Sequence, residues 1–174
     1  MIILKLILYI VVFISSSFIG FLFGGKYSKR VTSLASLQQS IRLLQTEIIV
    51  FANPFPYAIN NISKRISEDM VNVYSIIMNE MIINQSGDLY NGFIESIYYL
   101  KNNCLLKEED IDVFLSLGKV IGKTDRIDQE LQFKYVLNEI DHLIVDAKEE
   151  KIKNEKMYRS LGILMGLGMI IILI

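Results

Sequence analysis

The chain has 174 residues, of which 52% are hydrophobic and 21% are charged. Without its two apolar ends it keeps roughly 130 residues, the size of one domain, so its length excludes a multidomain protein. A net charge of -1 excludes the basic surface that nucleic-acid-binding proteins need. The single cysteine, Cys104, cannot close an internal disulfide, and the single histidine, His142, excludes a histidine-rich metal site.

The first 25 residues form an apolar run in which Lys5 is the only charge. A helix needs about 20 apolar residues to cross a bilayer, so residues 1–25 are predicted to be an N-terminal transmembrane helix. A cleaved signal peptide is the alternative, because residues 15–17 are small serines. The apolar run resumes after them and is followed by basic residues at 26–30, which favours an uncleaved helix with this flank in the cytoplasm.

The middle of the chain, residues 26–156, is predicted to form a water-soluble helical domain in the cytoplasm. Apolar residues recur there every three or four positions, and no stretch alternates long enough to indicate a strand. Helices are expected over residues 31–52, 56–67, 67–83, 89–102, 107–121 and from 125 onward. Short connections favour antiparallel neighbours, so the predicted fold is an all-α, antiparallel six-helix bundle. Its first and last helices are expected to continue into two terminal transmembrane helices.

The last residues, 157–174, form the second predicted membrane segment. Basic residues precede it, so the central domain is expected in the cytoplasm and both termini outside the cell membrane. Gly162 and Gly166 are four positions apart, the spacing that lets membrane helices approach closely. They could pack on this chain's first helix or on a partner's helix. The general frequency of glycine in membrane helices explains the pair equally well.

The chain offers few groups that could carry out chemistry. Residues 122–124, Gly-Lys-Thr, resemble the end of a phosphate-binding loop, but Leu117 stands where the motif needs glycine and a helix precedes the loop where a strand is required. His142 has no accompanying nucleophile or second ligand, and Cys104 is expected to be structural. We therefore expect no cofactor, no metal and no enzymatic activity. A small membrane enzyme that uses these two residues is the less favoured alternative.

Three stretches resemble one protein family. Residues 153–162, KNEKMYRSLG, followed by an apolar C-terminus, resemble the end of the stage III sporulation protein AB family. Residues 118–129 resemble that family's Gly-x-x-x-Gly-x-x-Asp-Arg-x-x-Gln segment, and residues 44–48 resemble its Leu-x-x-Glu-Ile stretch. The length and the two predicted membrane segments fit as well, so the resemblance covers essentially the whole chain.

The resemblance implies a non-enzymatic membrane component of the channel complex between mother cell and forespore, which is required for endospore formation. It implies a fold similar to the cytoplasmic domain of type II secretion F-type platform proteins, placed on the mother-cell side. The implied partners are the secretion-type ATPase, stage III sporulation protein AA, and other membrane proteins of the complex. An alternative is a membrane-anchored regulatory or sensory helical protein without a secretion partner.

Five residues form the expected partner interface. They combine charge with a well-defined turn, although each of them also suits a helix end for purely structural reasons. These residues are Glu47, Gly122, Asp125, Arg126 and Gln129.

Overall fold

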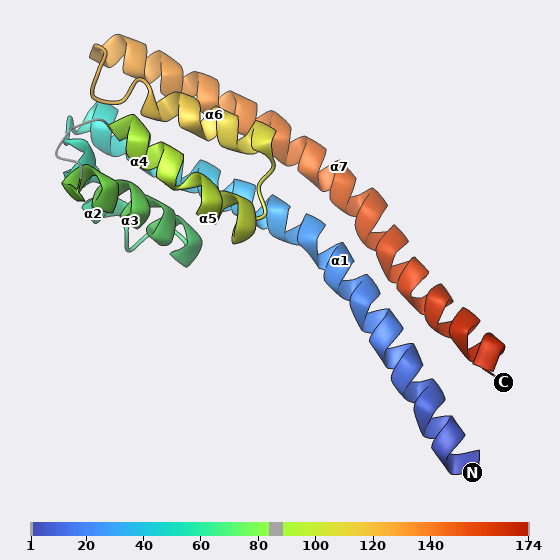
Figure 1. Cartoon of the computed structure of the whole chain (residues 1–174). Coiled ribbons are helices and arrows are strands. Elements are labelled where there is room, and N and C mark those ends of the chain that lie inside the picture. Colours follow the sequence, from blue (N-terminus) through green and yellow to red (C-terminus); the bar gives the residue numbers. More distant parts are fainter. Residues whose placement is uncertain (1, 84–88, 174) are drawn as a thin grey trace. The chain divides into compact units, whose positions relative to one another are not determined.

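A computed structural model describes residues 2–83 and 89–173, and within these ranges the chain forms helices and no strand. Figure 1 shows two long helices, α1 (Ile2–Gln45) and α7 (Arg126–Leu173), with shorter helices between them in the sequence. The other helices are the π-helix η1 (Thr46–Val50), α2 (Phe55–Ile62), α3 (Glu68–Ile83), α4 (Leu89–Glu95), α5 (Ile97–Asn102) and α6 (Glu108–Gly118). The turn expected at residues 84–88 lies outside the described residues.

The chain divides into two compact units. The helix-pair unit consists of Met1–Val31 and Asp146–Ile174, and the bundle unit consists of Thr32–Val145. The predicted membrane segments, residues 1–25 and 157–174, are shorter than the two parts of the helix-pair unit. Their limits stay a prediction.

The long helices confirm the expectation that the first and last helices run unbroken and antiparallel. In the helix-pair unit, the Ser16 hydroxyl donates a hydrogen bond to the Gly162 carbonyl at 2.8 Å. In the bundle unit, the Gln38 amide donates to the Asp141 carboxylate at 2.6 Å. The apolar stripe that the spacing predicts for the first helix is confirmed as far as Leu44, because four of its members are completely buried: Leu34, Leu37, Ile41 and Leu44. Its last two members, Ile48 and Phe51, lie beyond α1, and Phe51 is 62% exposed.

A cluster of aromatic rings joins four helices in the bundle core. The ring centroids of Phe93 (α4) and Phe114 (α6) are 4.7 Å apart, and Phe55 (α2) and Tyr74 (α3) lie around them. The hydroxyl of Tyr74 shares a 3.0 Å hydrogen bond with Ser40, so this buried polar group is satisfied. Large aromatic side chains bury the most apolar area, which makes this cluster the centre of the bundle.

Four helix limits differ from those expected. The first helix was expected to reach residue 52, but α1 ends at Gln45 and the π-helix η1 continues to Val50. Helix α2 ends at Ile62 and not at residue 67, because the backbone turns there and the Ser63 hydroxyl bonds back to Asn60. One helix was expected over residues 89–102, but α4 and α5 are separated at Ser96, whose hydroxyl donates to the Phe93 carbonyl. Such bonds compete with the helical pattern. Helix α6 ends at Gly118, three residues before the expected end.

One described helix is long and apolar enough to cross a membrane. It covers Tyr9–Val50, near the N-terminus, with a mean hydropathy of 1.6, and a signal sequence or a soluble core helix meets the same criterion. The described part of α7 does not meet it, so a second crossing at residues 157–174 stays a prediction.

Candidate functional site

The turn between α6 and α7 depends on two glycines for different reasons. Gly118 packs directly on the ring of Phe93, and an added Cβ would lie 2.6 Å from that ring's Cγ. Gly122 has open space around it but adopts a φ of +76°, where a side chain is strained. The first glycine allows close packing and the second allows the chain to turn.

The start of α7 is held by residues of the same turn. The Asp125 carboxylate accepts a 2.8 Å hydrogen bond from the backbone N–H of Asp128, which makes Asp125 the cap expected from the sequence. The side chain of Gln129 donates to the Thr124 carbonyl at 2.9 Å. Asp125 and Gln129 therefore both support the local geometry of the turn.

Arg126 connects the start of the last helix to the end of the first. Its guanidinium donates a hydrogen bond to the carbonyl of Ile49 in η1, although 77 positions separate the two residues. Carbonyls at the end of a helix lack partners within the helix and carry partial negative charge, so a cation there is favourable. Arg126 thus ties η1 to α7.

Glu47 faces inward and supports the same end of the bundle. It is 8% exposed, and its Oε2 accepts hydrogen bonds from the side-chain amides of Asn53 and Asn61, both at 2.8 Å. The bond from Asn61 and then that from Asn53 hold the pKa of the Glu47 carboxyl below its ordinary value of 4.5, with a smaller contribution from Arg65 and against the effect of burial. Glu47 therefore anchors the loop that follows η1.

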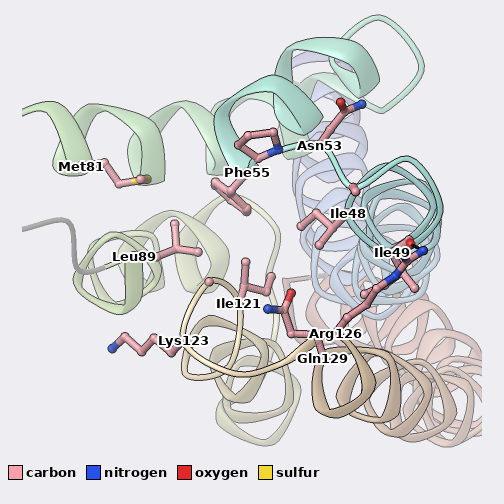
Figure 2. Close-up of a pocket in the computed structure, with 13 residues that line it drawn as sticks. Ile48, Ile49, Asn53, Phe55, Met81, Leu89, Ile121, Lys123, Arg126 and Gln129 are labelled. Carbon is pink, nitrogen blue, oxygen red and sulfur yellow. Dashed lines mark hydrogen bonds between the residues drawn. The ribbon is translucent and has the colours of Figure 1, made fainter.

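A cleft of about 400 Å³ lies between η1, the loop after it and the α6–α7 turn. Figure 2 shows Arg126 and Gln129 on one side of it, with apolar side chains such as Phe55 and Ile121 completing the lining. Of the five residues expected at the interface, Gly122, Arg126 and Gln129 line the cleft. The other two do not line it but bond to residues that do: Glu47 to Asn53, and Asp125 to Gln129 through the backbone.

The two side chains that the sequence offered for enzymatic chemistry, Cys104 and His142, do not gather at the cleft. Within residues 2–83 and 89–173, no group of three or more His, Cys, Asp or Glu side chains could hold a metal ion. Cys104 is fully buried and His142 is exposed, and neither lines the cleft. A mostly apolar cleft with cationic side chains such as Arg126 is suited to a protein segment that presents apolar and acidic groups.

Sequence reasoning missed Asn61 and Phe93. Asn61 lies in the last turn of the short helix α2, and nothing in its neighbourhood indicates that it bonds to Glu47. Phe93 was expected only as one apolar position among several. The small residue at Gly118 was a usable signal, because glycine within a helix often marks a close approach.

Two glycines of the last helix, Gly162 and Gly166, face the chain's own first helix. A Cβ added to Gly162 would lie 2.9 Å from the Cα of Gly20, and one added to Gly166 would lie 3.0 Å from the ring of Phe13. Gly20 has the matching contact, since its own Cβ would lie 2.7 Å from the carbonyl oxygen of Tyr158. The two backbones approach this closely because both sides of the contact lack a side chain.

A sequence model described as stage III sporulation protein AB matches residues 5–174. The chain belongs to this family. Stage III sporulation protein AB of Bacillus subtilis (strain 168) is 26% identical over 170 residues, which cover 98% of this chain and 99% of that protein. A solved structure of a stage III sporulation protein AB has a TM-score of 0.63 at 20% identity, and the match covers 72% of this chain and 98% of the other. The predicted family and the all-α fold are thereby confirmed.

Proposed function

We propose that this sporulation protein is a non-enzymatic integral membrane component of the channel complex between mother cell and forespore. In this role the bundle unit serves as a platform for the secretion-type ATPase, stage III sporulation protein AA. The observation that carries the proposal is the family match over residues 5–174. The cleft beside Arg126 supports the platform role, because it offers a binding surface without a catalytic set.

The surface next to the cleft also favours a protein partner. Ile127 follows Arg126 directly and is 71% exposed, and Leu131, one turn later on α7, is 58% exposed. Exposed apolar side chains at helical spacing beside cationic groups are typical of interfaces between proteins. The five residues of the expected interface then act mainly by shaping this end of the bundle, while the side chains around them make the contact.

Photo-crosslinking in sporulating cells tests the platform role. A crosslinking amino acid at Ile127 should give a product that contains the ATPase. The matched control is Tyr98 on α5, which is 76% exposed and lies outside the cleft, and it should give none. No product at Ile127, Lys123 or Gln129, in cells that still form spores, would contradict the platform role and favour the regulatory alternative.

The proposed location is the cell membrane, crossed twice, with the bundle unit in the mother-cell cytoplasm and both termini outside. Ile172→Cys in a Cys104→Ser background tests this. An impermeant thiol reagent should label the cysteine in intact cells. Labelling only after lysis would refute the proposed orientation.

A further inference from the structure

A groove of about 360 Å³ runs along α7 in the helix-pair unit, just before and across the start of the terminal apolar run. Its polar part is formed by Lys151, Glu155, Lys156, Arg159 and Ser160. Its apolar side chains are Ile152 and Ile163. Residues four positions apart lie above one another on a helix, so the lining groups fall into two neighbouring rows, one of residues 151, 155, 159 and 163 and one of residues 152, 156 and 160.

The charges in the groove are not balanced. Glu155 is the only acid among the lining residues, and it forms an ion pair with Arg159. The Glu155 side chain also lies against α1, since its Cγ would be 3.4 Å from a Cβ added to Gly24. Lys151 and Lys156 form no ion pair with any residue in the described part of the chain. The groove therefore has an excess of positive charge.

Arg159 is held in place at the apolar end of this cluster. Its guanidinium carbon lies 4.7 Å from the centre of the Phe21 ring on α1, in addition to its ion pair with Glu155. A cation over an aromatic face is attracted by the ring electrons and loses some of its freedom to move. An ordered guanidinium with free donors is suited to a phosphate group.

We propose that this groove binds the headgroup phosphate of an anionic phospholipid, with the acyl chains lying along the apolar surface that begins at Ile163. Lys151, Lys156, Arg159 and the Ser160 hydroxyl supply the donors for a phosphodiester. Ile163 and Leu164 are 40% and 62% exposed, so apolar surface continues directly from the cationic cluster. Basic grooves at the cytoplasmic end of membrane helices bind such headgroups through the same combination of charge and apolar contact.

A soluble phosphate compound could use the same donors, but it would leave Ile152 and Ile163 without a partner. Ile152 is 75% exposed, and a lipid covers such side chains while a small hydrophilic ion does not. The inference rests on the proposed membrane insertion of residues 157–174. It goes beyond the platform role, because it assigns a ligand to the helix-pair unit.

Lipid retention by the full-length protein tests the inference. The protein is reconstituted in equimolar phosphatidylcholine and phosphatidylglycerol and extracted in a nonionic detergent, and the bound lipids are counted by native mass spectrometry. The wild type should retain phosphatidylglycerol preferentially. The double variant Lys151→Gln, Lys156→Gln should lose roughly tenfold or more of this retention. The matched control Lys148→Gln, Lys153→Gln removes the same charge outside the groove and should lose less than about twofold.

Four outcomes would overturn the inference. Equal losses in both double variants would indicate diffuse attraction to the membrane surface. Displacement of the bound lipid by inorganic phosphate would indicate a site for soluble phosphates. A wild-type protein that resists carbonate extraction from membranes but shows no preference for phosphatidylglycerol would refute the lipid site and leave the proposed function intact. Release by carbonate would instead refute membrane insertion, and with it both proposals.

Discussion

Helices α1 and α7 contribute to both the helix-pair unit and the bundle unit, but they bury opposite kinds of residue in the two. In the bundle unit, α1 and α7 bury large side chains such as Leu37 and Phe133, both at 0% exposure. In the helix-pair unit, the same helices meet through Gly20 and Gly162, while large residues such as Phe18 are 62% exposed. The apolar face changes from inside to outside along each helix.

This reversal is the pattern expected if the helix-pair unit lies in lipid, as proposed, and the bundle unit in water. In water, burying large apolar side chains stabilises a fold, so they collect in the interior. Between lipids that stabilisation is absent, and helices associate through close packing of small residues. The contrast therefore supports a lipid environment for the helix-pair unit, and it can be tested by substitutions in both units.

The largest effect is expected from Phe114→Ala in the bundle unit. Phe114 is completely buried, with its ring centroid 4.7 Å from that of Phe93, and removing it leaves a cavity. We expect a loss of about 3–5 kcal/mol in the free energy of unfolding, measured by denaturant titration of the full chain in detergent. The comparison variant, Phe18→Ala in the helix-pair unit, should change it by less than about 1 kcal/mol. Equal losses would contradict the reversal.

The next effect is expected at the glycines of the α6–α7 turn. Gly118→Ala places a methyl group 2.6 Å from the Phe93 ring, and overpacking of this kind costs about 1–3 kcal/mol. Gly122→Ala meets no neighbour and should cost about 1–2 kcal/mol through its positive φ alone. Gly122→Asn should recover part of that loss, since asparagine tolerates this conformation, whereas Gly118→Asn should not. Thermal unfolding distinguishes these variants.

A smaller, local effect is expected from Gly162→Val. The added side chain would push against Gly20 and Ser16, so the two helices should separate there. The backbone amides of residues 16–24 should lose roughly tenfold in protection against hydrogen exchange. The protection of the amides in the bundle unit should stay the same. Gly168→Val is the matched control, because nothing lies within 4 Å of that position. Similar exchange in both variants would contradict the glycine contact.

The smallest effect is the pH dependence contributed by Glu47. Its pKa is lowered in the folded protein, so its stabilisation is fully present above the ordinary value of 4.5 and is lost as the pH falls through the lower folded value. In thermal unfolding, Asn61→Ala should reduce this dependence, because it removes the largest cause of the lowered pKa. Glu47→Gln should abolish it. Unchanged acid dependence in Glu47→Gln would show that other carboxylates dominate.

Much of the fold could be predicted because the signals are local. The apolar spacing in the first helix identified six positions, of which the four in α1 are completely buried, and a cap was expected at Thr124 or Asp125, of which Asp125 caps α7. The limits of α2 and the break at Ser96 could not be predicted in the same way. They depend on single side-chain bonds to the backbone, which compete closely with helix formation.

The candidate site was predicted only in part. Gly122, Arg126 and Gln129 were named from a motif and line one cleft, but the motif did not reveal that Arg126 bonds to Ile49. Glu47 was expected on a contact surface, and the structure places its carboxylate inward on two asparagines. No pattern in a single sequence indicates that a carboxylate will meet an amide fourteen positions later.

The sequence alone determined the family and the all-α class, because these follow from composition and from spacing within a few residues. Only the tertiary structure decided that Arg126 closes the end of η1 and that Gly162 packs on Gly20. Both contacts join residues far apart in the chain. Their existence depends on how whole helices pack against one another, which local spacing does not specify.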